Sequence, residues 1–361
     1  TVDSEQRITI KGDWKRKCEF QKTDKNNDYT KIKEEFGGIP ESKAFLISVN
    51  LTNEKMKTYI GYSLDENLRW RAASGGVGSS ILKYLFETKQ IETAITFTFD
   101  SNSLRYIPKL IYSFDDYMPI GSIYQEIDLI QFIKNHLNDI HGGFACFSLP
   151  CQSRAIKYHL ERTGHFCYII GLTCSSQQSI EATEYLLKRI HIDRKDVTNI
   201  QYRGNGWPSG ITIMLRSGEE KFVSNNFSIW TKIFHSRLFI MPRCFRCNDT
   251  LNLNADITLA DPWLKDILSS ETIGQTLIFE NVCSDILIRA CQLNYIQLQY
   301  INERTAVSSQ QGTINRKEKY RNKLITRKIL LFVNKNSIYK SVVKSIPFLF
   351  ELHCKAQKII E

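Results

Sequence analysis

Short apolar runs alternate with amphipathic stretches between residues 44 and 190. Runs rich in β-branched and aromatic residues predict strands, and apolar residues spaced by three and four positions predict helices. The expected strands are 44–51, 57–62, 94–99, 108–114, 143–149 and 165–172, and the expected helices are 79–88, 128–137, 152–162 and 180–190. Because strands alternate with helices, we expect an α/β fold with a mixed sheet flanked by helices.

From residue 197 onward the pattern becomes strand-rich and then helical. Strands are expected at 197–202, 211–215, 221–224, 257–259 and 276–279, with a hairpin turn at 216–219, and a helical stretch begins at 314. The pattern divides the chain into three parts: a loop-rich or degenerate N-terminal segment (1–42), a main domain (43–300) and a basic helical C-terminal tail (301–361).

The net charge of +10 lies almost wholly in that tail. Residues 301–361 contain 13 Lys and Arg against 4 Asp and Glu, a local charge of +9, which leaves about +1 for the rest. Since the tail lacks an aromatic β platform, we do not expect nucleic-acid binding. Its apolar residues recur at helical spacing. Two interpretations stay open: a helix packed on the body with a solvated charged face, or peripheral contact with anionic membrane lipid.

Composition and the first residues set the broad class. A hydrophobic content of 42% and a charged content of 24% are those of an ordinary globular protein. No apolar run approaches the roughly 18 residues that would span a bilayer. Residues 1–5 lack the basic and apolar regions of a secretory signal. We therefore expect a cytoplasmic protein, and on the lipid-binding interpretation of the tail it would be peripheral at the inner face of the membrane.

Ten cysteines are many for a chain without an export signal. Half of them are predicted to be small apolar core residues: Cys146, Cys167, Cys283, Cys291 and Cys354. Cys151 and Cys174 each follow a predicted buried strand, at the strand end where ligands bind in open α/β sheets. Cys244 and Cys247 form a Cys-x-x-Cys pair. Four convergent thiolates suit a zinc ion or a 4Fe-4S cluster, and spacing alone also allows core cysteines beside an accidental pair.

Four further segments carry candidate chemistry. Residues 73–80, Ala-Ser-Gly-Gly-Val-Gly-Ser-Ser, open a helix, and small residues there let a phosphate approach free N–H groups. Arg203 precedes a Gly-rich turn and can pair with an anion. Asp256 and Asp261 flank a short strand, and residues 121–124 are predicted to begin a helix.

Together, in this order, the motifs resemble the beta subunit family of coenzyme F420 hydrogenases and dehydrogenases. The resemblance covers about residues 44–300 and rests on residues 73–76, 121–124, 150–151, 174, 203–208, 244–249 and 255–263. It implies FAD and one 4Fe-4S cluster. The positions that match the cluster ligands are Cys151, Cys174, Cys244 and Cys247; those that match FAD contacts are Ser74, Gly75, Gly76, Ser122, Tyr124 and Asp261, to which Arg203 is added on its own chemistry.

The function that the resemblance implies is an FAD- and 4Fe-4S-dependent oxidoreductase that passes electrons between a one-electron carrier and a small-molecule or glycan substrate. The Lys- and Asn-rich composition and the basic tail favour the bacterial members found in polysaccharide gene clusters. Many members begin with a two-cluster ferredoxin module, but here the corresponding stretch contains Cys18 as its only cysteine. We therefore expect either a separate carrier such as ferredoxin or a module supplied by residues upstream of Thr1.

Two positions depart from the family pattern. Ile123 replaces a lysine, which removes a cationic contact, and Ala260 replaces a glycine, which adds a methyl group where backbone could come close. These departures favour an alternative: a non-catalytic, zinc-stabilised relative that has lost its flavin.

Overall fold

A computed structural model describes residues 56–360, with the exception of 208, 227, 265–273 and 283. The predicted N-terminal segment 1–42 and the predicted strand 44–51 lie outside the described residues. Residues Lys57–Glu361 form one compact unit.

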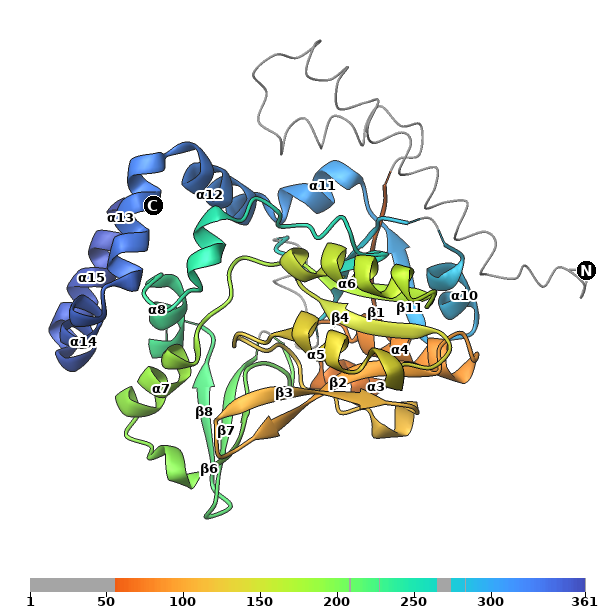
Figure 1. The fold of residues 1–361 in the computed structure, drawn as a ribbon, viewed down its shortest axis with the longest axis horizontal. Coiled ribbons are helices and arrows are strands. Elements are labelled where there is room, and N and C mark those ends of the chain that lie inside the picture. Colours follow the sequence, from red (N-terminus) through yellow and green to blue (C-terminus); the bar gives the residue numbers. More distant parts are fainter. Residues whose placement is uncertain (1–55, 208, 227, 265–273, 283, 361) are drawn as a thin grey trace, which may run out of the picture. The chain divides into compact units, whose positions relative to one another are not determined.

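An eight-stranded sheet forms the centre of this unit, in the order β11-β1-β10-β9-β5-β4-β2-β3 (Figure 1). The inner strands β2, β4, β5 and β9 run parallel to one another, and the remaining neighbours pair antiparallel. The sheet is therefore mixed, as predicted. Its strands are β1 (Lys57–Ser63), β2 (Thr93–Asp100), β3 (Arg105–Ile111), β4 (Phe144–Ser148), β5 (Cys167–Leu172), β9 (Ile257–Ala260), β10 (Thr276–Glu280) and β11 (Ile296–Tyr300).

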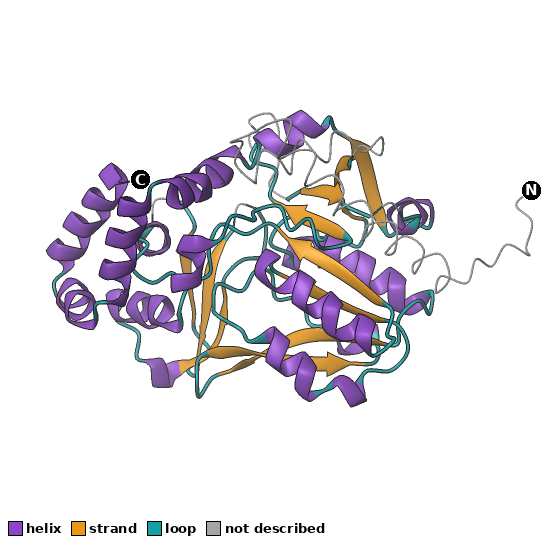
Figure 2. Ribbon diagram, turned by 45° about the horizontal axis from the view of Figure 1, so that its top comes forward, coloured by secondary structure: helices purple, strands orange, loops and turns teal. Residues whose placement is uncertain are grey.

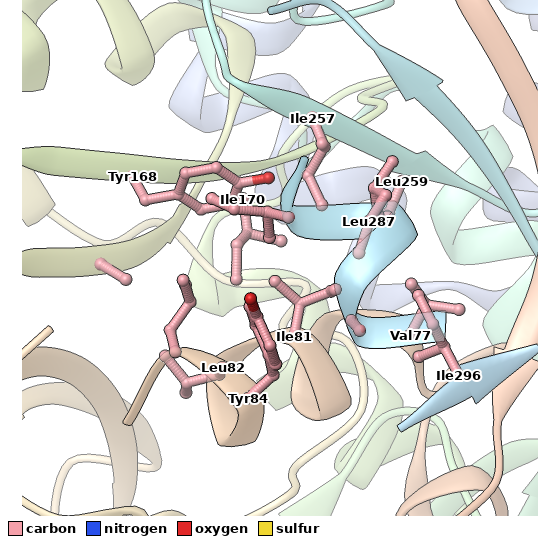
Figure 3. Packing of buried hydrophobic residues seen from close by; sticks show 14 of the residues in the cluster. Val77, Ile81, Leu82, Tyr84, Tyr168, Ile170, Ile257, Leu259, Leu287 and Ile296 are labelled. Atoms are coloured by element: carbon pink, nitrogen blue, oxygen red, sulfur yellow. The ribbon is translucent and has the colours of Figure 1, made fainter. Parts of the chain in front are cut away.

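Helices cover both faces of the sheet, and β5 shows how the faces are divided. Tyr168 and Ile170 point into a core with α4 (Val77–Glu87) and α10 (Ile286–Gln292), as Figure 3 shows. Cys167 and Ile169 pack on the opposite side with α5 (Leu129–Asn135) and α6 (Pro150–Arg162). Alternating side chains thus bury both faces of a parallel strand, which explains its continuous apolar run.

A second, antiparallel sheet contains β6 (Val197–Gln201), β7 (Gly210–Leu215) and β8 (Glu220–Ser224). It shares a core with α7 (Ile180–Arg189) and α8 (Ile229–His235), where Tyr202 and Trp230 are buried. The predicted strand-rich second half is present here. The short helix α3 (Glu66–Arg71) packs on β1. Single 3₁₀ turns occur at η1 (Phe114–Asp116), η2 (Leu137–Asp139), η3 (Arg194–Asp196) and η4 (Pro242–Arg246).

The C-terminal region is helical, as predicted, and extends away from the main sheet (Figures 1 and 2). Its helices are α11 (Glu303–Ser308), α12 (Gln311–Asn322), α13 (Leu324–Lys335), α14 (Ser337–Ser345) and α15 (Pro347–Ile360). Tyr320 and Leu330 pack with Phe245 of η4, and Val343 and Phe350 enter the second core. Among the described residues, no helix is long and apolar enough to cross a membrane.

The cysteines predicted to be structural divide into three groups. Cys146 and Cys167 are fully buried, which confirms them as core residues, and burial raises the pKa of both thiols above the ordinary value. Cys291 and Cys354 are partly buried and pack against the apolar cores. Cys283 lies outside the described residues.

Candidate functional site

A cavity of about 480 Å³ opens at the carboxyl ends of the parallel strands. Its walls come from segments far apart in the chain: the turn before α4, the segment 119–124, the residues after β4, β5 and β9, and residues of α12. This is the sheet edge at which ligands bind in open α/β folds. Most of the predicted FAD-contact residues lie on its wall, as does Arg203: Ser74, Gly76, Ser122, Tyr124 and Asp261.

The glycine turn presents a helix N-terminus to this cavity. Gly76 has a φ of 76°, in the left-handed region, and α4 starts directly after it without a side-chain cap or an acidic residue in its first turn. Val77, Gly78 and Ser79 of that first turn also line the cavity. Backbone N–H groups at an uncapped helix start favour an anion, so the geometry suits a phosphate.

Gly75 has a different place from its neighbours. Its N–H donates to Thr276 Oγ1 at 2.9 Å, and its carbonyl accepts a hydrogen bond from Ser63 N at 2.7 Å. A Cβ at Gly75 would lie 2.7 Å from both Gly61 O and Thr276 N. Gly75 therefore packs the turn against strands β1 and β10, behind the cavity wall. Its N–H already donates to Thr276 and is not offered to a ligand, contrary to the predicted FAD contact.

The substitution Gly75→Ala is expected to reduce the free energy of unfolding by about 1–3 kcal/mol, because the added methyl group meets backbone atoms that cannot rotate away. Urea unfolding monitored by circular dichroism measures this loss. Gly312→Ala is the matched control, since nothing lies within 4 Å of a Cβ added there. An unchanged midpoint for Gly75→Ala would contradict the packing described here.

The side chain of Arg203 links its own motif to two others, because it contacts Asp261 and Ala73. Its guanidinium contacts Asp261 Oδ2 at 2.6 Å and donates a second hydrogen bond to Ala73 O, while Trp207 stacks 5.2 Å from it. Burial would lower the pKa of Arg203, but the Asp261 carboxylate beside it, with Tyr124, raises the pKa above its ordinary value. Arg203 is thus a permanent buried cation at the cavity wall.

The segment 119–124 is not helical, and the prediction of a helix start there is wrong. Gly121 has a φ of 66°, and a Cβ on it would lie 2.1 Å from the carbonyl oxygen of Arg203. The backbone instead crosses over Arg203. Tyr124 then packs against Tyr202, and Ile123 packs on the second core while also lining the cavity.

Several buried polar atoms on the cavity wall have no hydrogen-bond partner within the part of the chain that the structure describes. They are Thr96 Oγ1, Ser176 Oγ, Thr250 Oγ1 and Arg203 Nε. A buried polar group without a partner costs about 1–3 kcal/mol. These atoms therefore indicate a polar ligand in the cavity.

A second cavity of about 300 Å³ is lined by all four cysteines of the predicted cluster set: Cys151, Cys174, Cys244 and Cys247. Cys151 lies in the first turn of α6, which begins at Pro150 and not at the predicted residue 152, because Leu149 acts as the N-cap residue. Cys174 follows β5, and the other two lie in and directly after η4. All four are free thiols.

Electrostatic coupling links the four thiols. Burial raises the pKa of Cys174 to about 12, Lys317 opposes this rise, and the other three cysteines add to it. Burial also raises the pKa of Cys151 and of Cys244. These three thiols are therefore protonated at neutral pH, and binding a metal there releases protons.

Lys317 was not anticipated from the sequence. It lies on α12 and is only 3% exposed, with Nζ 3.4 Å from Cys247 Sγ and 2.5 Å from Asp249 O. Gln310, Thr313 and Arg316 reach the larger cavity from the same region. These polar residues of α12 and its N-cap recur at helical spacing, and such residues usually form a solvated face. The sequence pattern therefore does not indicate that this helix contributes to the two cavities.

Asp256 and Asp261 flank β9 (Ile257–Ala260), as predicted, but the two carboxylates have different surroundings, and that of Asp256 is engaged away from the cavity. The Asp256 carboxylate contacts Lys157 Nζ at 2.9 Å and accepts from Ile169 N at 2.7 Å, at the amino end of β9. Only Asp261, at the carboxyl end, faces the cavity.

The two cavities share a wall. Leu149, Cys174, Ser176, Gln177 and Arg243 line both of them. Gln177 N also donates to Cys244 Sγ at 3.4 Å. The cavity with the helix N-terminus and the cavity with the four thiols are therefore neighbours.

Comparison with known families matches two adjoining sequence profiles. Both describe the "Coenzyme F420 hydrogenase/dehydrogenase" beta subunit: residues 58–132 match the profile of its N-terminal part, and residues 143–304 match the profile of its C-terminal part. These two matches together span more than half of the 361 residues. The chain belongs to the coenzyme F420 hydrogenase/dehydrogenase beta subunit family.

A solved structure supports the fold of this family member. A chain of the F420-reducing NiFe hydrogenase complex from Methanosarcina barkeri is similar, with a TM-score of 0.55 and 14% identity. The similarity covers 73% of this chain and 90% of that chain. No curated protein matches the sequence. The resemblance stated from the motifs is confirmed at the level of the family and of oxidoreductase electron transfer.

The side chains of Ile123 and Ala260, the two positions that differ from the family pattern, do not fill the larger cavity. Ile123 and Ala260 both line the larger cavity, which remains about 480 Å³ in volume. Ala260 is buried at the end of β9, in register with Leu277 of β10. The added methyl group is thus accommodated in the sheet.

Proposed function

We propose that this family member is an FAD- and 4Fe-4S-dependent oxidoreductase that passes electrons between a one-electron carrier and an organic substrate. The observation that carries the proposal is the shared wall: Cys174 belongs both to the cavity with the four thiols and to the cavity with the α4 N-terminus. Groups held in the two cavities would be separated only by the side chains that line both.

The donor set fits a cluster. Four cysteines are the ligand set of a 4Fe-4S cluster. Within the described ranges, no three His, Cys, Asp or Glu side chains lie close enough together to hold a single metal ion. A zinc ion with bonds of about 2.3 Å requires its sulfurs nearly in contact, whereas a larger cluster holds its four cysteines farther apart. Four cysteines on one cavity wall suit a cluster or a zinc ion, and metal analysis distinguishes the two.

The larger cavity fits a flavin dinucleotide. Its uncapped helix N-terminus suits a pyrophosphate, and Arg203 supplies a buried positive charge. The hydroxyls of Thr96, Ser176 and Thr250, which have no partner among the described residues, offer hydrogen bonds. When bound, a flavin would exchange an electron pair with the substrate as hydride, and a cluster would exchange single electrons with a carrier.

The residues of the chain have separable tasks in this proposal. The first turn of α4 and Arg203 bind negative charge, and Asp261 holds the guanidinium in place. Lys317 places a positive charge beside Cys247, which offsets the charge of a thiolate. Tyr117, which stacks on Phe147 and shares a hydrogen bond of 2.9 Å with Ser79 Oγ, adds an aromatic ring to the cavity wall.

Two tryptophans suggest the substrate class. Trp263 lines the larger cavity yet is 53% exposed, and its ring lies 5.9 Å from that of Trp207. Flat aromatic faces with an exposed side suit stacking on a sugar or another ring. The two rings therefore support a small-molecule or glycan substrate. Together with the Lys- and Asn-rich composition, this favours an enzyme of the cytoplasm that acts in the synthesis of cell-surface polysaccharide. A separate carrier such as ferredoxin would supply or accept the electrons.

Reduction by a carrier tests the proposed reaction. Chemically reduced ferredoxin, mixed anaerobically with the protein, is expected to bleach the visible absorbance of the flavin, because the cluster cavity borders the flavin cavity. Stopped-flow absorbance follows the transfer. A protein whose visible spectrum stays unchanged with reduced ferredoxin, but changes with dithionite, would lack this electron path.

Lys317 is expected to raise the midpoint potential of the cluster, because a buried positive charge favours the added electron. The substitution Lys317→Met keeps the side-chain length and should lower that potential, measured by a redox titration followed by electron paramagnetic resonance. Lys317→Arg should restore it, and Lys319→Met, which changes a lysine of the same helix that lines neither cavity, is the control. An unchanged potential in Lys317→Met would contradict this role.

A further inference from the structure

The last three helices expose an unusual number of large apolar side chains. About half of those that the described residues expose lie within residues 324–359, and α13, α14 and α15 lie together at one end of the compact unit (Figures 1 and 2). They are Leu324, Ile325, Ile329, Phe332, Ile338, Val342, Ile346, Phe348, Leu352 and Ile359, with exposed fractions from 43% to 86%.

The spacing shows that outward helix faces carry these side chains. On α13, Ile325, Ile329 and Phe332 follow one another at intervals of four and three, while Leu330 and Asn334 are buried on the other side. On α15, Phe348 and Leu352 are exposed, and Phe350, His353 and Gln357 are buried. A surface helix normally turns its apolar face to the core. Here both the inward and the outward faces include apolar residues, so the outer faces require a partner.

Charge indicates what kind of partner fits. Residues 323–358 contain eight basic residues and one acidic residue, Glu351: the basic ones are Lys323, Arg327, Lys328, Lys335, Lys340, Lys344, Lys355 and Lys358. Lys340 and Lys344 pair with Glu181, and Glu351 pairs with Lys232. Lys328 and Lys335 are exposed and share the stripe of Ile325 and Phe332 on α13.

A second copy of the chain would bring like charges together at this surface, so self-association is disfavoured. Apolar side chains among lysines match the layered chemistry of an anionic lipid surface, in which acyl chains lie beneath negative headgroups. We infer that the outer faces of α13, α14 and α15 dock on the surface of an anionic membrane. The inference does not depend on the proposed function, because none of these exposed residues lines either cavity.

Point substitutions test this more sharply than truncation, because the preceding helix α12 supplies Lys317 to the cysteine cavity. The full chain is mixed with vesicles of phosphatidylcholine, alone or with phosphatidylglycerol, at low salt, and the bound fraction is measured by flotation. The chain should bind the anionic vesicles and be released by salt. Ile325→Ser with Phe332→Ser should weaken binding about tenfold or more, and Lys328→Gln should weaken it about fivefold.

Matched controls keep the result specific. Phe222→Ser removes a phenylalanine of β8 that is 63% exposed, and Lys188→Gln removes an exposed lysine of α7; both should bind like the parent. Equal iron content and circular dichroism show that each variant is folded. The inference is overturned if the parent ignores anionic vesicles, if the α13 variants bind as well as the parent, or if those variants instead convert a dimer to a monomer.

Discussion

Replacing Cys174 by serine is expected to remove nearly all of the iron from the anaerobically purified protein. The expectation follows from the position of Cys174 on the wall between the two cavities, with Cys151, Cys244 and Cys247 around the same space. A cluster held by four thiolates depends on each of them, and a serine hydroxyl is a poor replacement for a soft thiolate ligand. Iron analysis and the visible spectrum measure the loss, and the same result is expected for the other three cysteines.

Matched controls come from cysteines that are partly buried elsewhere. Cys291→Ser on α10 and Cys354→Ser on α15 should leave the iron content unchanged, because neither residue lines the cysteine cavity. Iron that survives replacement of Cys174 would contradict the assignment. Zinc in place of iron in the parent would instead support the zinc-stabilised relative.

Neutralising the buried Arg203–Asp261 pair is expected to lower the flavin content at least about tenfold while the iron is retained. Removing Arg203 alone would leave a buried carboxylate without compensation, which costs about 3–5 kcal/mol and obscures the result. The double variant Arg203→Gln with Asp261→Asn removes both charges together. It keeps a polar contact but loses the buried cation that faces the cavity beside the α4 N-terminus. Flavin released by denaturation and measured by fluorescence gives the content.

The control is a second neutralised pair outside the site. Arg105 and Glu126 form an ion pair of 2.9 Å, and neither lines a described cavity. Arg105→Gln with Glu126→Gln should therefore keep the parent flavin content. Loss of flavin and iron together in the Arg203 variant would show general unfolding, whereas parent-like flavin content would show that this pair does not bind the cofactor.

Much of the fold could be predicted from local patterns. The buried strand 165–172 corresponds to β5 (Cys167–Leu172), and the helix 180–190 corresponds to α7 (Ile180–Arg189). Such elements are encoded by neighbours along the chain, since a continuous apolar run or a three-and-four spacing is visible locally. The strand order of the sheet, which places β9 between β5 and β10, depends on contacts between distant segments, and no local pattern specifies it.

The candidate site shows the same division. The four cysteines were identified because each belongs to a recognisable motif, and the structure brings them to one cavity. Lys317 was missed because a lysine on a basic helix looks solvated until the packing of Tyr320 on Phe245 is known. Gly75 was predicted to contact FAD together with its neighbours, because sequence spacing does not show which residues of a turn face a ligand. The hydrogen bond from its N–H to Thr276 shows that it faces the sheet.

The most direct measurement is the cofactor content of the full chain purified without oxygen. The absorbance spectrum, together with iron, zinc and flavin analysis, should show about four irons and one flavin per chain, because the four thiols fit a 4Fe-4S cluster and the adjoining cavity fits a dinucleotide. A colourless protein that contains zinc, with neither iron nor flavin, would contradict the account.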